Sequence, residues 1–339
     1  MTIKKKPYLI AEVGQAHNGD IQKAHDYIDA VAKTGVDAIK FQTHIADAES
    51  SMHEPFRVQF TTEYDSRFEY WKAMEFSLEE WKSLKKHCDA VGLEFMSSPF
   101  SNAAVDLLEQ VGIKRYKVGS GEVNNLLLLE KIAQTKKPVI LSSGMSSFEE
   151  LDVAVSFLKS RKIDFSIMQC TTAYPTSSEQ LGFNVIRELK KRYNVTVGFS
   201  DHSAKISTGI AAIALGAEIF EFHVVLSRDE SGPDVTSSLT IEEVKTLTEE
   251  VEYIYHALKN PIDKRNTDDF TELKQIFEKS LAVNKALPKG HCLTFLDLDA
   301  KKPKGYGIDA IEFENDVGKK LSRDLSPWEF LNDKDLESV

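Results

Sequence analysis

The feature of this sequence that most constrains its fold is an alternation between short apolar runs and longer amphipathic stretches. Eight runs of the kind expected for β-strands occur in about the first 260 residues, near 8–13, 38–42, 93–98, 115–118, 139–142, 165–169, 196–198 and 219–224. Helical patterns lie between or after them, as at 21–34, 77–91, 102–111, 148–159 and 241–258. Strands that alternate with helices form parallel sheets. Eight such units favour an α/β fold of the closed (β/α)8, or TIM-barrel, type.

An open doubly wound sheet is the alternative fold for such a pattern. That fold usually has fewer strands and carries a glycine-rich GxGxxG loop after the first one. The corresponding segment here, residues 12–19, has the sequence EVGQAHNG and lacks that spacing. The barrel is therefore the favoured prediction.

A long insertion separates the second and third predicted strands. It covers residues 44–76, whereas connections in such folds usually have roughly 2 to 6 residues. The segment is polar but contains many aromatic residues, namely Phe56, Phe60, Tyr64, Phe68, Tyr70 and Trp71. Long loops of this kind usually carry function, so we expect a functional role for residues 44–76, called the insertion below.

A second module is expected after the barrel. Residues 260–269 are charged and contain a proline, which is typical of a linker. From about residue 280 the sequence changes to short apolar runs broken by turns with glycine or proline, a pattern typical of a small β-rich unit. We therefore predict a barrel over residues 1–262, a linker over 263–279 and a β-rich domain over 280–339.

Composition excludes several kinds of partner. The chain has 42 Lys and Arg against 53 Asp and Glu, a net charge of −11, which argues against nonspecific binding to nucleic acid or to an anionic membrane. No apolar stretch approaches the roughly 18 residues of a membrane span, and the first apolar run is too short for a signal peptide. Cys88, Cys170 and Cys292 fit neither a disulfide framework nor a CxxC metal site. We expect them to be small core residues of a soluble, cytoplasmic protein.

Polar residues at the ends of the predicted strands are the candidates for an active site, because (β/α)8 enzymes place their sites there. The first strand contributes Glu12. In the second strand, Lys40 and Gln42 point to the same side because side chains alternate along a strand. A barrel has no edge strand from which a lysine could reach solvent, so a functional role of Lys40 is favoured over a structural one.

Serines and a second lysine follow the next three predicted strands. The third strand ends with Ser98, the fourth contains Lys117 and leads to Ser120, and the fifth ends with Ser142. Each serine alone would be an ordinary turn or helix-capping residue. Their recurrence on successive strands beside two lysines predicts a cradle for an anionic group such as phosphate or carboxylate.

Further polar residues follow the sixth to eighth predicted strands, namely Thr172, Tyr174, Ser200, His202 and His223. Imidazole binds borderline divalent ions, so His202 and His223, with Glu12 or water completing the coordination, predict a site for Mn²⁺, Mg²⁺ or Zn²⁺. A structural or acid–base role of the two histidines is the alternative. His17 and His44 also follow strands and are retained as possible site residues.

Eight segments, taken in order, resemble the sialic acid synthase family, whose members condense phosphoenolpyruvate with an N-acylated hexose to form nine-carbon sugar acids. The segments are IAEVG at 10–14 with HNG at 17–19, IKFQTH at 39–44, SSPF at 97–100, YKVGSGE at 116–122, LSSGM at 141–145, CTTAYP at 170–175, SDH at 200–202 and GPD at 232–234. The region from about residue 280 is similar to the antifreeze-protein-like (SAF) domain of these enzymes. The resemblance spans nearly the whole chain and implies the same barrel followed by that domain.

The resemblance also implies roles for individual residues. Positions that hold phosphoenolpyruvate in the family correspond here to Lys40, Ser98, Lys117, Ser120, Ser142 and Ser200. Positions associated with the amino sugar correspond to Glu12, Gln42, Tyr174 and Asp234. His202 and His223 match the ligands of a divalent metal, for which Mn²⁺ or Mg²⁺ is expected. Glu122 matches a carboxylate near the metal-bound water and is the candidate acid–base residue, so the predicted catalytic set is Glu122, Lys117 and Glu12.

Two positions depart from the family pattern. Thr172 stands where members place an asparagine or another small polar residue beside the phosphate. Lys302, in the segment KKPKG at 301–305, stands where the C-terminal domain usually presents an arginine. In the family that arginine reaches the sugar in the partner subunit of a domain-swapped homodimer, the assembly that the resemblance implies here. Lysine lacks the bidentate contacts of arginine, so the sugar preference is open even if Lys302 is the substitute.

The activity that the resemblance implies is condensation of phosphoenolpyruvate with N-acetylmannosamine and water to give N-acetylneuraminate and phosphate by C–O cleavage. The first alternative is a synthase of a legionaminic-type or pseudaminic-type acid that uses a diacetamido-trideoxyhexose, because the barrel motifs do not distinguish the acceptors. An aldose-phosphate synthase would need a further basic site for the sugar phosphate. A non-catalytic carbohydrate-binding or ice-binding protein is disfavoured, since so many polar groups are costly to leave unpaired in an inert pocket.

Overall fold

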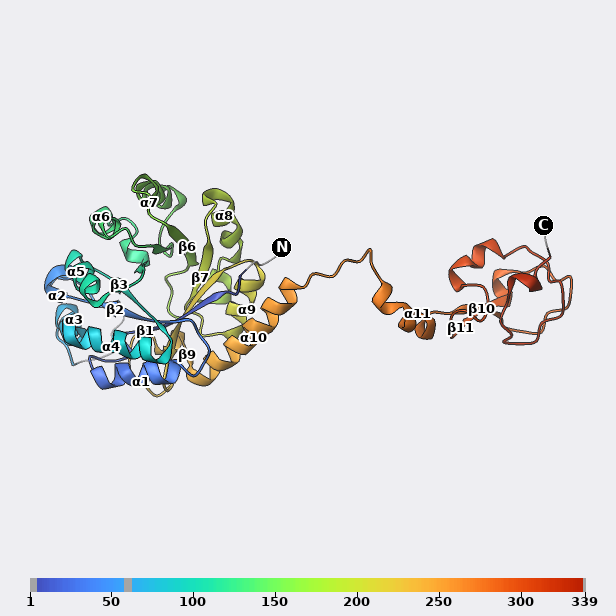
Figure 1. Cartoon of the computed structure of the whole chain (residues 1–339), viewed down its shortest axis with the longest axis horizontal. Coiled ribbons are helices and arrows are strands. Elements are labelled where there is room, and N and C mark those ends of the chain that lie inside the picture. The colour runs from blue at the N-terminus through green and yellow to red at the C-terminus, as the bar shows by residue number, and fades with distance from the viewer. Residues whose placement is uncertain (1–4, 58–62, 338–339) are drawn as a thin grey trace. The chain divides into compact units, whose positions relative to one another are not determined.

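The computed structural model describes residues 5–57 and 63–337 of the chain (Figure 1). It divides into two compact units, Met1–Pro261 and Ile262–Val339. Each unit is described by itself below. Phe60 of the insertion lies outside the described residues.

The first unit is a closed parallel barrel of eight strands. These are β1 (Tyr8–Gly14), β2 (Ala38–Thr43), β3 (Glu94–Pro99), β4 (Tyr116–Val118), β5 (Val139–Ser142), β6 (Phe165–Cys170), β7 (Val197–Asp201) and β8 (Ile219–Val225). Each strand pairs with the next in parallel, and β1 pairs with β8 to close the barrel. A short strand that was not predicted, β9 (Ser238–Thr240), pairs with β8. The (β/α)8 prediction is confirmed.

Helices surround the strands of the barrel, as Figure 1 shows. They are α1 (Ile21–Val31), α4 (Leu78–Val91), α5 (Asn102–Val111), α6 (Leu126–Gln134), α7 (Phe148–Ser160), α8 (Phe183–Tyr193), α9 (Ile206–Ala214) and α10 (Ile241–Lys259). Three of them begin at a capping box, in which a Ser or Thr and the Glu three residues later satisfy each other's backbone N–H groups; the pairs are Ser77 with Glu80, Ser147 with Glu150 and Thr240 with Glu243. Within the described residues, no helix combines the length and the apolar character that crossing a membrane requires.

Two apolar layers fix where the site lies. A large core between strands and helices includes the fully buried side chains of Tyr27, Phe41 and Trp81. A smaller buried cluster is formed by residues of six strands, namely Ile10, Ala38, Met96, Ile140, Met168 and Ile219. Side chains two residues further along a strand face the same side. The residues two positions later are Glu12, Lys40, Ser98, Ser142, Cys170 and Glu221, so a polar layer follows the small apolar cluster toward the carboxyl ends of the strands.

The described part of the insertion carries two short helices, α2 (Ala46–Glu49) and α3 (Arg67–Met74). Ala46, Tyr70, Trp71 and Met74 form a separate buried cluster there. The aromatic residues of the insertion thus give it a small core of its own, which explains how so long a connection can be ordered.

The second unit contains helix α11 (Thr271–Phe277) and a two-stranded antiparallel sheet of β10 (Ser280–Val283) and β11 (Leu298–Lys301). Its core consists of Leu281, Val283, Leu287, Leu293, Leu321, Leu325 and Leu331. Helix α11 lies inside the stretch 263–279 that was predicted as a linker, so that stretch is partly helical. The likeness of this unit to an SAF domain stays a prediction.

The loop between β1 and α1 approaches the insertion at Gly19, which gives a test of this packing. Gly19 has a left-handed backbone, φ +72°, and a Cβ there would overlap the carbonyl oxygen of Ala73. Gly92 has a similar φ of +82° but an added Cβ would meet nothing within 4 Å. We expect Gly92→Ala to lose about 1–2 kcal/mol of unfolding free energy from backbone strain alone, and Gly19→Ala to lose at least about 1 kcal/mol more. Equal urea midpoints for the two variants would contradict the close approach.

Candidate active site

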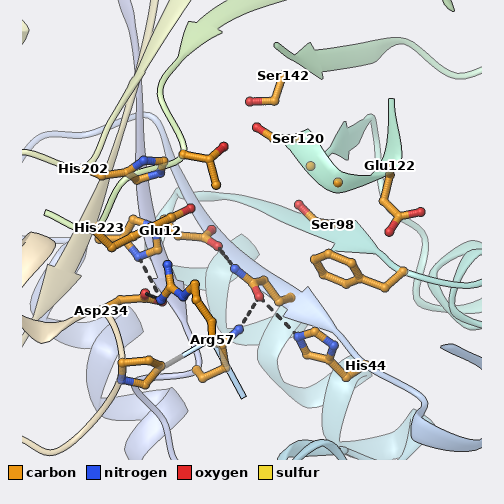
Figure 2. A pocket seen from close by; sticks show the side chains of 18 of the residues that line it. Glu12, His44, Arg57, Ser98, Ser120, Glu122, Ser142, His202, His223 and Asp234 are labelled. Atoms are coloured by element: carbon orange, nitrogen blue, oxygen red, sulfur yellow. Dashed lines mark hydrogen bonds and ion pairs between the residues drawn. The ribbon is translucent and has the colours of Figure 1, made fainter. Parts of the chain in front are cut away.

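A cavity of about 350 Å³ opens at the carboxyl ends of the barrel strands (Figure 2). Every residue of the predicted catalytic, substrate-binding and metal-binding sets lines it except Lys302, which belongs to the second unit. The structure therefore brings together residues that lie more than 200 positions apart in the sequence, such as Glu12 and Asp234. In the second unit, the Lys302 ammonium lies 4.8 Å from the ring centroid of Phe277.

The floor of the cavity is a network of four buried charges. The Nζ atom of Lys40 lies 2.5 Å from Glu12 Oε2 and 3.8 Å from Glu221 Oε1, and Lys117 Nζ lies 3.4 Å from Glu221 Oε1. Burial opposes ionisation of Glu221, but the ammonium groups of Lys117 and Lys40 outweigh it and lower the pKa of this carboxyl. Two cations and two anions balance, so the charges can be buried together.

Hydroxyl groups surround this network. Lys40 Nζ donates to Ser98 Oγ at 3.4 Å, and Ser200 Oγ donates to Glu221 Oε1 at 3.1 Å. The backbone N–H of Gly144 donates to Ser120 Oγ at 3.1 Å. A Cβ at Gly144 would clash with the hydroxyls of both Thr172 and Ser120, so only glycine lets them come this close. Ammonium groups, hydroxyls and a nearby glycine backbone therefore lie together here, and this group of residues is called the cradle below; that it binds an anion stays a prediction.

The two candidate metal ligands lie on one side of the cavity in Figure 2. Their ring centroids are 5.3 Å apart. The Nδ1–H of His202 can donate to the backbone oxygen of Thr171, 2.9 Å away, which leaves the Nε2 lone pair available. Burial, reinforced by His223, lowers the pKa of His202 to about 3. This imidazole is therefore neutral near pH 7, as a metal ligand must be.

The donor set fits a divalent ion with an open coordination shell. No group of three or more His, Cys, Asp or Glu residues suited to holding a metal occurs among residues 5–57 and 63–337. Glu12, the third ligand considered from the sequence, is engaged by Lys40 and by Gln42, whose Nε2 donates to Glu12 Oε1 at 2.7 Å. Two imidazoles would hold the ion, and water or substrate would fill the remaining positions.

Glu122 lies across the cavity from the two histidines in Figure 2. It ends the short 3₁₀ turn Ser120–Glu122 and accepts a hydrogen bond from Asn125 Nδ2 at 2.8 Å. Burial raises the pKa of Glu122 above its ordinary value, which favours the protonated form that can donate a proton. This environment suits the predicted acid–base role of Glu122. Contrary to what the resemblance implied, however, the side chain does not lie beside the candidate metal ligands.

Arg57 is a site residue that sequence reasoning missed. Its Nη2 donates to Asp234 Oδ1 at 2.7 Å, and its guanidinium lies 4.0 Å from the ring centroid of Tyr174. Tyr174 in turn stacks on His202 with centroids 4.0 Å apart. Arg57 comes from the insertion, so only the folded insertion could place it here. The one feature of the sequence that could have indicated Arg57 was its position in a segment rich in aromatic residues.

Glu221 was also missed as a site residue, although a signal for it existed. It lies two positions before His223 on the same strand, so alternation directs both side chains into the barrel. A carboxylate between two lysines stays ionised and balances their charge inside the barrel. The pairing with Lys117 and Lys40 across the barrel could not be inferred from β8 alone.

His17 and His44, the two histidines left open by the sequence, separate in the structure. His44 lines the cavity, whereas His17 does not. The ring of His17 packs on Phe76 with centroids 4.7 Å apart, and its Nδ1 accepts a hydrogen bond from the backbone N–H of Gly19. His17 therefore supports the loop after β1.

The three cysteines are free, and they differ in their surroundings. Cys88 lies in the barrel core, in line with the prediction of a small core residue. Cys170 is buried but lines the cavity, and Cys292 is exposed. The prediction of a core residue is therefore wrong for Cys292, because it lies on the surface of the small second unit.

Comparison with known proteins agrees with this site. A family model described as the NeuB family matches residues 27–263, so the chain belongs to the NeuB family. It is 32% identical over 335 residues to an N,N'-diacetyllegionaminic acid synthase of Campylobacter jejuni, covering 97% of this chain and 100% of that protein. It is 30% identical over 335 residues to a pseudaminic acid synthase of Helicobacter pylori, covering 98% of each.

A solved structure supports the same relationship. The N-acetylneuraminic acid (sialic acid) synthetase of Leptospira borgpetersenii, in complex with citrate, aligns with a TM-score of 0.70 and 29% sequence identity. The alignment covers 79% of this chain and 90% of that one. The chain is thus similar over most of its length to synthases named for sialic, legionaminic and pseudaminic acids.

Acid sensitivity provides a test of the buried histidines. Burial, helped by His44, lowers the pKa of His17 to about 3, whereas an unfolded histidine has a pKa of ~6.5. Between these values the unfolded chain binds more protons, so stability falls as the pH decreases from ~6.5. In His17→Gln we expect the unfolding free energy to fall less steeply with decreasing pH, by up to about 1.4 kcal/mol per pH unit. Urea unfolding between about pH 4.5 and 6.5 measures this slope. The exposed His53, changed to Gln, is the control; an unaltered slope in His17→Gln would refute the assignment.

Proposed function

We propose that this protein is an N-acetylneuraminate synthase, which condenses phosphoenolpyruvate with N-acetylmannosamine and water and releases phosphate. The observation that carries the proposal is the cradle of Lys40, Lys117 and the surrounding hydroxyls, next to a histidine pair suited to a divalent ion. Phosphoenolpyruvate carries a phosphate and a carboxylate, which are the groups that such donors bind. Membership of the NeuB family agrees with this class of reaction.

The residues of the cradle would orient phosphoenolpyruvate. Lys40 and Lys117, with the hydroxyls of Ser98, Ser120 and Ser142, would hold its phosphate and carboxylate; Ser200 and Thr172 complete the set. This arrangement would direct C3 of phosphoenolpyruvate toward C1 of the open-chain sugar, whose amino-sugar contacts would come from Glu12, Gln42, Tyr174 and Asp234. Holding both reactants at close range supplies a large part of the rate enhancement. A divalent ion, Mn²⁺ or Mg²⁺, held by His202 and His223, would supply Lewis-acid polarisation of the aldehyde oxygen.

The chemistry requires two new bonds and one cleavage. The C3–C1 bond forms as the aldehyde oxygen takes up a proton, and C2 becomes an oxocarbenium centre. Water adds to C2 and loses a proton, for which Glu122 is the proposed acid–base residue. In the tetrahedral intermediate the bond between C2 and the phosphate oxygen then breaks, the C2 hydroxyl gives up its proton to the departing phosphate, and C2 becomes the ketone carbon. No nucleophilic side chain is needed, and the buried carboxylates Glu12 and Glu221 pair with Lys40 and Lys117 and so keep the ammonium groups in place.

Electrostatics of the outer cavity favour an acceptor without a phosphate group. The two arginines that line it are already paired, Arg57 with Asp234 and Arg67 with Glu54 at 2.9 Å. Glu49 and Glu122 line the cavity as well. A sugar phosphate would need an unpaired cation and would meet this negative charge. The same argument disfavours an aldose-phosphate synthase.

The alternative acceptor is a diacetamido-trideoxyhexose, with a legionaminic-type or pseudaminic-type product. The specific support is that relatives at 30–32% identity carry those names. Such sugars are also neutral, so the charge argument does not separate them from N-acetylmannosamine. A non-catalytic carbohydrate-binding role is the distant alternative, and the charge-balanced cradle argues against it.

We further propose a domain-swapped homodimer in which Lys302 takes part in the sugar site of the partner subunit. Its support is the exposed apolar surface of the second unit, where Ile276, Phe277, Tyr306 and Ile311 are 57%, 60%, 66% and 85% exposed. An interface between two copies of the chain would remove such side chains from water.

Acceptor specificity is tested by phosphate release from phosphoenolpyruvate in the presence of Mn²⁺ or Mg²⁺. We expect turnover with N-acetylmannosamine and none with its 6-phosphate, because Arg57 and Arg67, the arginines of the described cavity lining, are both already paired with carboxylates. Turnover only with a 2,4-diacetamido-trideoxyhexose would move the product to the legionaminic or pseudaminic class. No release with any of these sugars would refute the proposed function.

The metal role is tested by His202→Ala. The variant loses one of the two imidazole donors, so we expect metal-dependent turnover to fall by at least about 100-fold and added Mn²⁺ not to restore it. His256→Ala, on the exposed surface of α10, is the matched control. Full activity of the wild type in a chelating buffer would overturn the metal role.

A further inference from the structure

His44 lies at the junction between β2 and the insertion. Its contacts indicate a role that the proposed function does not include. Its ring is 4% exposed and lies between two aromatic side chains. The ring of Trp71 stacks on it at 3.9 Å and 17°, and that of Phe100 at 4.6 Å and 9°. Trp71 belongs to the insertion and Phe100 follows β3 of the barrel, so His44 is held between the two.

Both ring nitrogens of His44 face oxygen atoms. Nδ1 lies 2.6 Å from Glu49 Oε1, and Nε2 lies 3.2 Å from Gln42 Oε1. The orientation of the Gln42 amide follows from its other contacts, since its Nε2 donates to Glu12 Oε1 and its Oε1 accepts from Gln15 Nε2. Turning this amide over would set its oxygen against the Glu12 carboxylate and its nitrogen against that of Gln15.

The hydrogen-bonding partners of His44 indicate which of its nitrogens carry a hydrogen. A carboxylate and an amide oxygen are both acceptors, so each nitrogen of His44 must carry a hydrogen to satisfy its contact. A neutral ring would leave one nitrogen lone pair directed at an oxygen. The imidazolium form is compensated by the buried Glu49 and by the faces of two aromatic rings, which attract cations.

We propose that His44 is a positioning residue, held as an imidazolium, that fixes the Gln42 amide and through it the Glu12 carboxylate at the acceptor side of the cavity. The inference rests on the proposed function for its kinetic consequence, because Gln42 and Glu12 are the proposed sugar contacts. It assigns the insertion a defined task. The insertion contacts His44 through Glu49 and Trp71. His44 in turn connects it to the buried charged network that includes Glu12 and Lys40.

The protonation is tested without turnover, on the full chain labelled with ¹⁵N-histidine. We expect both nitrogens of His44 to show protonated chemical shifts at neutral pH, with the signal assigned by its loss in His44→Phe. In Glu49→Gln, which removes the compensating charge, one nitrogen of His44 should become unprotonated. A neutral His44 in the wild type would overturn the proposal even if the protein proved to catalyse another reaction.

The positioning role is tested by steady-state kinetics with the acceptor that supports turnover. His44→Phe keeps the stacked ring but loses both hydrogen bonds, so we expect kcat/KM for the acceptor to fall about 10- to 100-fold. The KM for phosphoenolpyruvate and the rise in Tm that it causes should change little, because the cradle is intact. His53→Phe, an exposed histidine of the same insertion, is the control.

Further comparisons separate positioning from folding. Glu49→Gln keeps His44 and its stacking partners, so it should show the same selective loss for the acceptor with a near-wild-type Tm. Equal losses for acceptor and phosphoenolpyruvate in both variants would indicate general disruption and overturn the proposal, as would unchanged kinetics. If the wild type shows no turnover, the proposed function fails, while the nitrogen spectrum still decides the protonation of His44.

Discussion

The buried network of Lys40, Glu12, Glu221 and Lys117 is the constraint on which the rest of the site depends. Four ionised side chains in a barrel interior are tolerable only when each charge has a close partner of opposite sign. The small apolar cluster lies two residues earlier on most of these strands and packs beneath the charged residues. A shift in the register of one strand would therefore disturb both the apolar packing and the charge pairs. An incoming anion would exchange existing ion pairs for new ones instead of entering an apolar cavity.

Around this network the cavity has two chemically different halves. The inner half combines ammonium groups with hydroxyls and suits a small anion such as phosphoenolpyruvate. The outer half combines carboxylates, paired arginines and aromatic rings, and suits a neutral polyol with an acyl group. The candidate metal ligands lie beside Tyr174 at the boundary of the two halves. This division is the physical basis for proposing a condensation between a charged and an uncharged substrate.

The insertion supplies much of what distinguishes the outer half. Arg57 covers Tyr174 and pairs with Asp234, while Trp71 and Glu49 hold His44. Relatives with similar identity to this chain carry the names of different sugar acid synthases. The described residues of the insertion line the proposed acceptor side of the cavity and supply none of the lysines or hydroxyls of the cradle, so such preferences can change there without altering the reaction.

The sequence by itself determined the barrel and which polar residues meet at its carboxyl end. Both follow from the pattern along the chain, since eight βα units close in only a few ways and Lys40, Lys117 and the serines lie in or directly after the carboxyl halves of parallel strands. Only the tertiary structure decided which groups pair. Arg57 with Asp234, His44 with Glu49 and the two lysines with Glu221 depend on how separate elements approach one another. Hydrogen bonds and ion pairs act over a few ångströms, and the pattern along a single element carries no information about such distances.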